Sequence, residues 1–266
     1  MHQAEASETS QDILVDRAED GVVTITLNRP RVKNAIAAHM WEELRCAFHE
    51  INQTESDRIV VITGAGGAFC AGADLSEDMA SGMHPLNAMQ PVNAAAIALH
   101  ELTKPSIAKV SGVAVGAGMN LALGCDLIVA DESARFSQVF ARRGLSLDFG
   151  GSWLLPRLVG MHKAKELALF GDVISAAEAE RIGVVNRVVP DDELDAFVDD
   201  WAKRLAQGPP LAMQMTKRMI TNAFSLSLSE SLGWEAASQT VNFASKDTRE
   251  GVLAFIEKRA PVFRGR

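Results

Sequence analysis

Short apolar runs and amphipathic stretches alternate along the first two thirds of the chain. Residues 22–27 and 58–63 are short and mostly apolar, which predicts β-strands. The turn residues Glu19-Asp20-Gly21 follow the apolar run 13–15 and predict a hairpin that leads into 22–27. Residues 37–52 instead repeat apolar side chains every three or four positions, which predicts an amphipathic helix.

The same alternation continues toward the C-terminal third. Further strands are expected at 107–110, 127–130 and 184–189, and a further helix is expected over 92–102. Strands that alternate with helices are typical of an α/β fold whose strands are largely parallel and buried. From residue 194 onward the pattern is helical, with helices expected at 194–207, 210–225, 228–244 and 246–257.

These patterns divide the chain into three regions. We expect a flexible N-terminus over 1–11, a core over 12–193 that carries the site, and a helical C-terminal region over 194–266 that covers the core or binds another subunit. Within the core, Gly82, Pro85 and Pro91 predict a mobile loop over residues 74–91.

Composition narrows the classes of protein that remain. With 266 residues and 47% hydrophobic content, the chain can bury a sizeable core. Its net charge of -8 argues against a general nucleic-acid surface, which needs lysine and arginine to neutralise phosphates. Three scattered cysteines form neither a disulfide framework nor a zinc motif, and neither a secretory signal nor a bilayer-spanning run is visible. We therefore expect a cytoplasmic protein that does not insert into membranes.

Two glycine-rich stretches carry the clearest chemical signal. Residues 69–74 (Phe-Cys-Ala-Gly-Ala-Asp) and 116–120 (Gly-Ala-Gly-Met-Asn) each follow an apolar strand and can open a helix. Free backbone amides at a helix N-terminus favour an anion, and two such donors can hold the oxygen of an enolate. The alternative explanation is close packing of backbone against a neighbouring element. Residues 64–67 also contain three glycines but lack both the dinucleotide spacing and a P-loop lysine, which favours a tight turn.

Among the acidic residues, Asp148 differs because apolar residues surround it. Leu145-Ser146-Leu147 precede it and Phe149-Gly150-Gly151 follow. Burial raises the pKa of a carboxyl group and suits it for proton transfer near neutral pH. A capping aspartate before a glycine turn is the alternative. The six histidines form no set of metal ligands, and there is no G-x-S-x-G nucleophile motif.

Taken together, a series of motifs in order along residues 13–264 resembles the crotonase superfamily, the enoyl-CoA hydratase/isomerase family. They are Asn28-Arg29-Pro30 with Asn34-Ala35, the stretch 69–75, Lys104-Pro105, Gly116-Ala117-Gly118, Cys125-Asp126, residues 154–157 (Leu-Leu-Pro-Arg), and Arg249-Glu250-Gly251 with 255–259 (Phe-Ile-Glu-Lys-Arg). The resemblance implies an α/β, crotonase-like spiral of β-β-α units with a C-terminal α-helical region. It also implies assembly into homotrimers or hexamers, and an acyl-CoA thioester as substrate, as in fatty acid metabolism. Coenzyme A is then part of the substrate, and no prosthetic group or metal is expected.

The resemblance also assigns residues. The oxyanion donors are the amides of Ala73 and Ala117. The CoA moiety passes Val32, Asn34, Ala35, Ala71, Ala73, Asp74 and Leu75, and it meets Phe255 and Lys258, which an adjacent subunit can supply. Asn120 is expected to line the acyl pocket, with Phe140, Leu145 and Trp153 forming its apolar wall.

The chain departs from the family pattern at two positions, and this difference favours isomerisation over hydration. Hydratases of this family use two glutamates to activate water, and those positions hold Asn120 and Phe140 here. Positioned acid–base groups commonly contribute about 10² to 10⁴ in rate, so efficient hydration is not expected. Asp148 resembles the catalytic aspartate of an isomerase branch that includes the phenylacetate-pathway isomerases. We expect an isomerase with Asp148 as acid and base; the alternatives are a hydratase that holds water with Asn120 and Asp148, covalent chemistry on Asp148, and a non-catalytic acyl-CoA binder.

Overall fold

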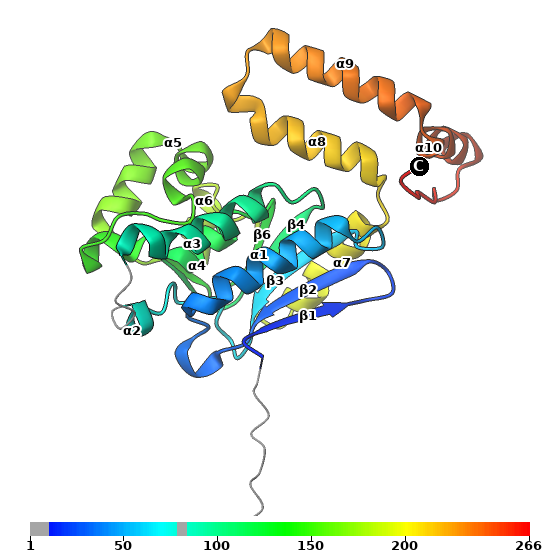
Figure 1. Cartoon of the computed structure of the whole chain (residues 1–266). Coiled ribbons are helices and arrows are strands. Elements are labelled where there is room, and N and C mark those ends of the chain that lie inside the picture. The colour runs from blue at the N-terminus through cyan, green and yellow to red at the C-terminus, as the bar shows by residue number, and fades with distance from the viewer. Residues whose placement is uncertain (1–10, 79–83) are drawn as a thin grey trace, which may run out of the picture.

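A six-stranded sheet forms the centre of the protein, which the computed structural model describes over residues 11–78 and 84–266 (Figure 1). The strand order is β1-β2-β3-β4-β6-β9, and only the β1–β2 pair is antiparallel. The hairpin predicted at Gly21 is confirmed, because this residue has a φ of 86° and joins β1 to β2. The strands are β1 (Ile13–Arg17), β2 (Val22–Leu27), β3 (Ile59–Gly64), β4 (Ser106–Val110), β6 (Leu127–Asp131) and β9 (Arg187–Val189).

A second, smaller sheet lies beside the first and consists of β5 (Val113–Val115), β7 (Arg135–Ser137) and β8 (Ile174–Ser175). Successive turns of the chain give one strand to each sheet: β4 is followed by β5, and β6 is followed by β7. Two isolated parallel bridges, Cys70 with Ala114 and Ile36 with Ala73, extend the smaller sheet to the segments that follow β3 and β2. The mixed α/β class predicted from the sequence is confirmed.

Helices cover both faces of the large sheet. On one face lie α1 (Ala38–Gln53), α3 (Pro85–His100) and α4 (Ala117–Leu123), and on the other lies α7 (Leu194–Ala206) (Figure 1). Side chains of β3 alternate accordingly, since Val60 and Ile62 belong to the first hydrophobic cluster and Ile59 and Val61 to the second. Parallel strands buried on both faces need such continuous apolar runs.

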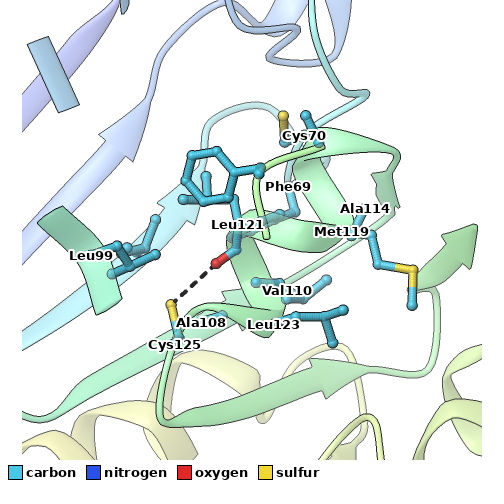
Figure 2. Close-up of a cluster of buried hydrophobic side chains, with 14 of the residues drawn as sticks. Phe69, Cys70, Leu99, Ala108, Val110, Ala114, Met119, Leu121, Leu123 and Cys125 are labelled. Atoms are coloured by element: carbon cyan, nitrogen blue, oxygen red, sulfur yellow. Dashed lines mark hydrogen bonds between the residues drawn. The ribbon is translucent and has the colours of Figure 1, made fainter. Parts of the chain in front are cut away.

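The first cluster extends beneath the segments that the sequence singles out. Figure 2 shows Phe69, Leu99 and Leu121 packed together, with Cys70 and Ala114 nearby. The Cys125 thiol contacts the carbonyl oxygen of Leu121 at 3.6 Å. The glycine-rich stretches therefore rest on a rigid apolar base.

The C-terminal helices differ from α7 in their surroundings. Whereas α7 contributes Leu194, Val198, Ala202 and Ala206 to the second cluster, α8, α9 and α10 project away from the sheet (Figure 1). The predicted helices are confirmed as α8 (Pro210–Asn222, continued by the 3₁₀ turn η3, Ala223–Ser225), α9 (Leu228–Ala244) and α10 (Lys246–Glu257). Lys217 ties α8 to the core, because its Nζ donates to the Lys104 carbonyl at 2.9 Å and lies 2.7 Å from Asp126, whereas α9 and α10 lie farther out.

The loop predicted over 74–91 is wrong, because this segment is largely helical where it is described. Helix α2 (Leu75–Asp78) follows Asp74, and α3 begins at Pro85. Proline is tolerated there because the first position of a helix needs no intrahelical hydrogen bond from its nitrogen. Residues 1–10 and 79–83 lie outside the described residues, and they include Gly82 and all but the last residue of the flexible N-terminus predicted over 1–11.

The strand expected over 184–189 is shorter than predicted. The amides of Val184 and Val185 both donate to the carbonyl of Ala179 and so close the end of α6 (Ala176–Arg181) instead of joining the sheet. Pairing with β6 begins only at Arg187.

Candidate active site

The two glycine-rich stretches meet because they occupy equivalent places in successive turns of the spiral. Cys70 bridges Ala114 in parallel, with its amide donating to Val113 at 2.8 Å and its carbonyl accepting from Val115 at 2.9 Å. Ala73 follows Cys70 by three residues, and Ala117 follows Ala114 by three. The repeat of the fold therefore brings the two predicted donor residues together.

The Ala73 amide is left free by the pairing of its neighbours. Gly72 accepts from the Ile36 amide at 2.8 Å, and Asp74 donates to the Ile36 carbonyl at 2.9 Å. In a parallel bridge of this kind the N–H of the central residue points to the opposite side. Within residues 11–78 and 84–266, no group accepts a hydrogen bond from the Ala73 amide.

The Ala117 amide is free because it opens a helix. Gly116 caps α4 with a φ of 57°, and its own amide donates to Ser137 at 2.9 Å. The first amides of a helix have no intrahelical acceptor, and across the described part of the chain none accepts from Ala117. A Cβ at Gly72 would lie 2.9 Å from the Val115 carbonyl oxygen and 3.7 Å from the Ala117 nitrogen, so only glycine permits this approach of the two segments.

Cys70 braces the two segments, a role that sequence reasoning missed. Its Sγ accepts from the Gly72 amide at 3.4 Å, and a Cβ at Gly118 would lie 2.4 Å from its carbonyl oxygen and 2.8 Å from its Sγ. Burial raises the pKa of the Cys70 thiol to about 12, and the nearby Asp148 carboxylate raises it as well, against the Gly72 amide. This thiol is neutral and packs as a structural group.

Asp148 lies beside the brace, half-buried, in the turn that precedes α5 (Gly151–Phe170). Its Oδ1 is inaccessible to solvent and has no hydrogen-bond partner among the described residues. Burial raises the pKa of Asp148 to about 6, although the Asn120 side chain opposes the rise. Such a carboxyl group can accept and return a proton near neutral pH.

Backbone strain positions this carboxyl group. Phe149 has a φ of 44°, a left-handed conformation that costs a bulky residue about 1–2 kcal/mol. Its ring is 2% exposed and packs 5.4 Å from the ring of Trp41 on α1, which offsets the strain. Asp148 is therefore held by an anchored neighbour. It does not cap α5, because the N-cap is Gly150 and, within the described residues, no side chain bonds to that helix end.

Asn120 is fully buried on the first turn of α4. Its Nδ2 donates to the main-chain carbonyl of Asp148 at 3.0 Å, and its Oδ1 accepts from Gln138 Nε2 at 2.7 Å. A Cβ at Gly151 would lie 2.4–2.6 Å from the Asn120 amide atoms. Sequence reasoning placed Asn120 at the site but missed Gln138, whose signal is a polar residue at the end of a buried strand.

The three residues predicted for the acyl wall have different surroundings. Phe140, in the 3₁₀ turn η2 (Val139–Arg143), is buried, and its Cζ lies 3.6 Å from the point where a Cβ of Gly116 would stand. Leu145 is 48% exposed. Trp153 packs edge-on against His100 and under the Arg157 guanidinium, 3.7 Å from the ring centroid. Their contact with an acyl chain stays a prediction.

Two segments predicted to pass CoA lie side by side. The Ala71 amide donates to the Lys33 carbonyl at 2.9 Å, which continues the Ile36 bridge and brings together Val32, Asn34, Ala35, Ala71, Ala73, Asp74 and Leu75. Val32 and Leu75 are exposed and free to contact a ligand. The Asn34 side chain instead bonds to the backbone at Arg29, Ala65 and Ala68, so it holds the turn.

Phe255 and Lys258 are not brought to this site within one chain. Both are exposed at the end of α10, and Phe255 is 85% exposed. Figure 1 shows α10 at the opposite side of the molecule from α2 and α5. Their predicted contact with CoA therefore requires a second chain.

The described residues hold no cluster of three or more histidine, cysteine, aspartate or glutamate side chains suited to a metal ion. Nor does any helix in the described ranges have the length and apolar character needed to cross a membrane.

Known proteins resemble this chain over nearly its whole length. The sequence profile of the enoyl-CoA hydratase/isomerase family matches residues 17–266. The chain is 41% identical over 248 residues to a probable enoyl-CoA hydratase of Rhodobacter capsulatus, covering 93% of this chain and 96% of that protein. It is 36% identical over 260 residues to the 1,2-epoxyphenylacetyl-CoA isomerase of Escherichia coli, covering 96% and 99%.

A solved structure shares the fold over nearly the same span. The crystal structure of an enoyl-CoA hydratase from Bacillus anthracis superposes with a TM-score of 0.92 at 36% identity, covering 96% of this chain and all of that one. Together with the profile match, these similarities show that the chain is an enzyme of the crotonase superfamily and belongs to the enoyl-CoA hydratase/isomerase family.

Proposed function

We propose that the protein moves a double bond in an unsaturated acyl-CoA. The amides of Ala73 and Ala117 bind the thioester carbonyl oxygen, and the Asp148 carboxylate removes a proton from the adjacent carbon. The electron pair of that C–H bond passes to the carbonyl oxygen and forms an enolate. Protonated Asp148 then returns the proton farther along the acyl chain as the enolate collapses. No atom is gained or lost overall.

The observation that carries this proposal is the half-buried Asp148 carboxyl group near Cys70, together with two amides that have no acceptor within the described residues. A pKa raised to about 6 lets Asp148 act as base when ionised and as acid once it is protonated. An amide aimed at a developing oxyanion typically contributes about 2.7–4 kcal/mol to lowering the barrier. Two donors and one carboxyl group are the parts that proton relocation needs.

Hydration is the second candidate, because relatives such as the Rhodobacter capsulatus protein are named hydratases. Both polar atoms of the Asn120 side chain are already engaged, by Gln138 and by the Asp148 carbonyl. Phe140 is apolar. Because neither an amide nor a phenyl ring can take a proton, a water molecule would depend on Asp148 alone for activation, which favours isomerisation over hydration.

The decisive test is Asp148→Asn assayed on a 3-enoyl-CoA in deuterated water. Isomerisation and deuterium exchange at the carbon next to the thioester are expected to fall by about 10²- to 10⁴-fold. Asp20→Asn is the matched control, because Asp20 lies in the exposed β1–β2 turn and its variant should keep full activity. Unchanged turnover in Asp148→Asn would eliminate the proposal.

Two further measurements separate the alternatives. Release of 3-hydroxyacyl-CoA from a 2-enoyl-CoA at an ordinary enzymatic rate would establish a hydratase, and a mass increase on Asp148 during turnover would reveal covalent chemistry. A non-catalytic binder would show a ligand-dependent rise in Tm with no turnover on either substrate.

We also propose that the active form is a trimer or hexamer in which α10 of one chain reaches the CoA of another. Support comes from α10, which carries Phe255, is capped by Lys258 and lies apart from α2 and α5 of its own chain (Figure 1). Large apolar side chains in the segments that precede α10 are exposed, among them Phe224 in η3 and Leu228 and Phe243 in α9. Extensive exposed apolar area of this kind is typical of protein–protein contacts.

A further inference from the structure

Gln138 is a fully buried polar residue that joins the small sheet to the site. It stands between β7 and η2, and its exposed fraction is zero. Its Nε2 donates to Asn120 Oδ1, whereas its Oε1 is buried with no partner among the described residues. Burying a side-chain amide with an unpaired oxygen lowers the stability of the folded state. The one hydrogen bond that Gln138 does make, to Asn120, therefore needs an explanation.

The direction of this side-chain contact is fixed by the main chain. The Asp148 carbonyl can only accept, so the Asn120 amide must present its nitrogen to that oxygen. Asn120 then presents Oδ1 to Gln138, so Gln138 must donate through its Nε2. Reversing Asn120 would place two oxygens face to face.

Close packing holds the Asn120 side chain in this orientation. The backbone of Gly151 lies against the Asn120 amide so closely that a Cβ there would overlap it. The Gly151 amide also donates to the Asp148 carbonyl at 2.9 Å, so that oxygen accepts two hydrogen bonds. Asn120 lies three residues after Ala117 on α4. One end of the arrangement is therefore tied to an oxyanion donor and the other to the residue that carries the acid.

We propose that Gln138 is a positioning residue that acts through Asn120 to fix the Asp148 backbone, and hence its carboxyl group, relative to the Ala73 and Ala117 amides. The proposal rests on the function proposed above. Gln138 does not touch the reacting atoms. Its effect is on geometry, so its loss lowers kcat and leaves the binding of CoA largely intact.

Gln138→Met tests the proposal, because it keeps the side-chain length and removes the donor. A misplacement of about 1 Å at reacting groups can reduce a rate by about 10²-fold, and we expect kcat to fall by about 10- to 100-fold with KM changed by less than about 2-fold. Gln138→Asn, which retains an amide but is too short to reach Asn120, is expected to show the same pattern and serves if the Met variant folds poorly.

Ser106→Ala is the matched control for lost stability. Ser106 is also fully buried, and its hydroxyl donates to Asp126, which pairs with Lys217 of α8. It begins β4, and its side-chain hydrogen bonds in the described structure do not involve Asn120 or Asp148. Both variants are expected to lower Tm, and only the Gln138 variants should lower kcat. Equal kcat values in Gln138→Met and Ser106→Ala would overturn the proposal.

A double-mutant cycle with Asn120→Ala tests whether Gln138 acts through Asn120. Once Asn120 is truncated, Gln138→Met should reduce kcat by less than about 2-fold further, because residues that share one network do not have additive effects. Additive losses in kcat would contradict the proposal.

Hydrogen exchange separates failure of this proposal from failure of the proposed function. Gln138→Met should accelerate exchange of the Gly151 amide, which the Asp148 carbonyl protects, whatever the reaction proves to be. If Asp148→Asn retains activity, the function is wrong and this readout still decides the role of Gln138. Unchanged Gly151 exchange would overturn the positioning role by itself.

Discussion

Around Asp148 the groups without partners are polar and buried, whereas on α8–α10 they are apolar and exposed. Asp148 Oδ1 and Gln138 Oε1 are shielded from solvent with no partner in the described structure, and Phe224 and Phe243 on the C-terminal helices are more than 70% exposed. Unmet acceptors of this kind match a small group that donates a hydrogen bond, whereas the free amides of Ala73 and Ala117 match an acceptor oxygen. Unmet apolar area calls for another protein surface.

The difference also shows how each region is built. The site depends on main-chain geometry that only a few residue types allow, as at Gly72 and Gly151. The C-terminal helices depend on ordinary helical patterning and tolerate many side chains, provided that the surface remains apolar. Substitutions in the first region should therefore affect chemistry, and those in the second should affect assembly.

Ala117→Pro gives the largest expected effect after removal of the acid itself. Proline deletes the amide donor but suits the first position of a helix, which Ala117 occupies in α4. We expect kcat on a 3-enoyl-CoA to fall by about 10²- to 10³-fold.

The matched control for that loss is Ala38→Pro. Ala38 holds the first position of α1, is exposed, and follows Ala37, whose extended backbone suits a residue before proline. Its variant should keep full activity. Comparable activity in both proline variants would show that the Ala117 amide is not an oxyanion donor.

Asp148→Asn should stabilise the protein while it lowers turnover by about 10²- to 10⁴-fold. Because the pKa of Asp148 rises from 3.8 to about 6 on folding, the folded state holds the proton more tightly. Stability is therefore lost as pH increases between these two values, by up to roughly 3 kcal/mol. Urea unfolding should show the variant more stable than wild type at about pH 7, with the difference shrinking toward about pH 4. A pH-independent difference would contradict the burial of an ionised carboxylate.

The same pKa sets the pH dependence of activity. The base must be ionised, so kcat/KM is expected to rise with pH and level off above an apparent pKa of about 6. A flat profile across this range would argue against Asp148 as the base in the free enzyme.

Phe243→Asp probes the other region and should leave chemistry nearly intact while weakening assembly. Burying a phenylalanine contributes about 1.5–3 kcal/mol, so the dissociation constant between chains should increase by about 10- to 100-fold. Sedimentation over a dilution series measures this change. Ser229→Asp, which adds the same charge at an exposed polar position of α9, should weaken assembly less.

Sequence patterns predicted the regular elements of this fold well, and the reason is periodicity. The bounds of α9 and α10 agree with prediction, since nothing in those helices departs from regular patterning. The strand over 184–189 was overextended because the Val184 and Val185 amides are taken by α6, a tertiary contact that no apolar run reveals.

The site was predictable only in part, for a different reason. The glycine-rich stretches predicted an anion site and the apolar neighbours of Asp148 predicted a desolvated carboxyl group, because those constraints are local. Only the resemblance to the crotonase superfamily assigned the donors to Ala73 and Ala117. Gln138 and Cys70 escaped notice, since each acts through contacts with distant segments. The left-handed backbone at Phe149 was also invisible, because phenylalanine is a residue that ordinarily avoids it.

The three cysteines differ in exposure, so their reaction with a thiol reagent can measure local opening of the structure. Cys46 is exposed on α1, whereas Cys70 and Cys125 are buried in the first cluster. A thiol reagent should therefore modify one cysteine at once and the other two only when the surrounding structure opens. The labelling rate at Cys70 would then report how often the structure packed beneath the Ala73 and Ala117 amides opens. A bound thioester should slow this labelling.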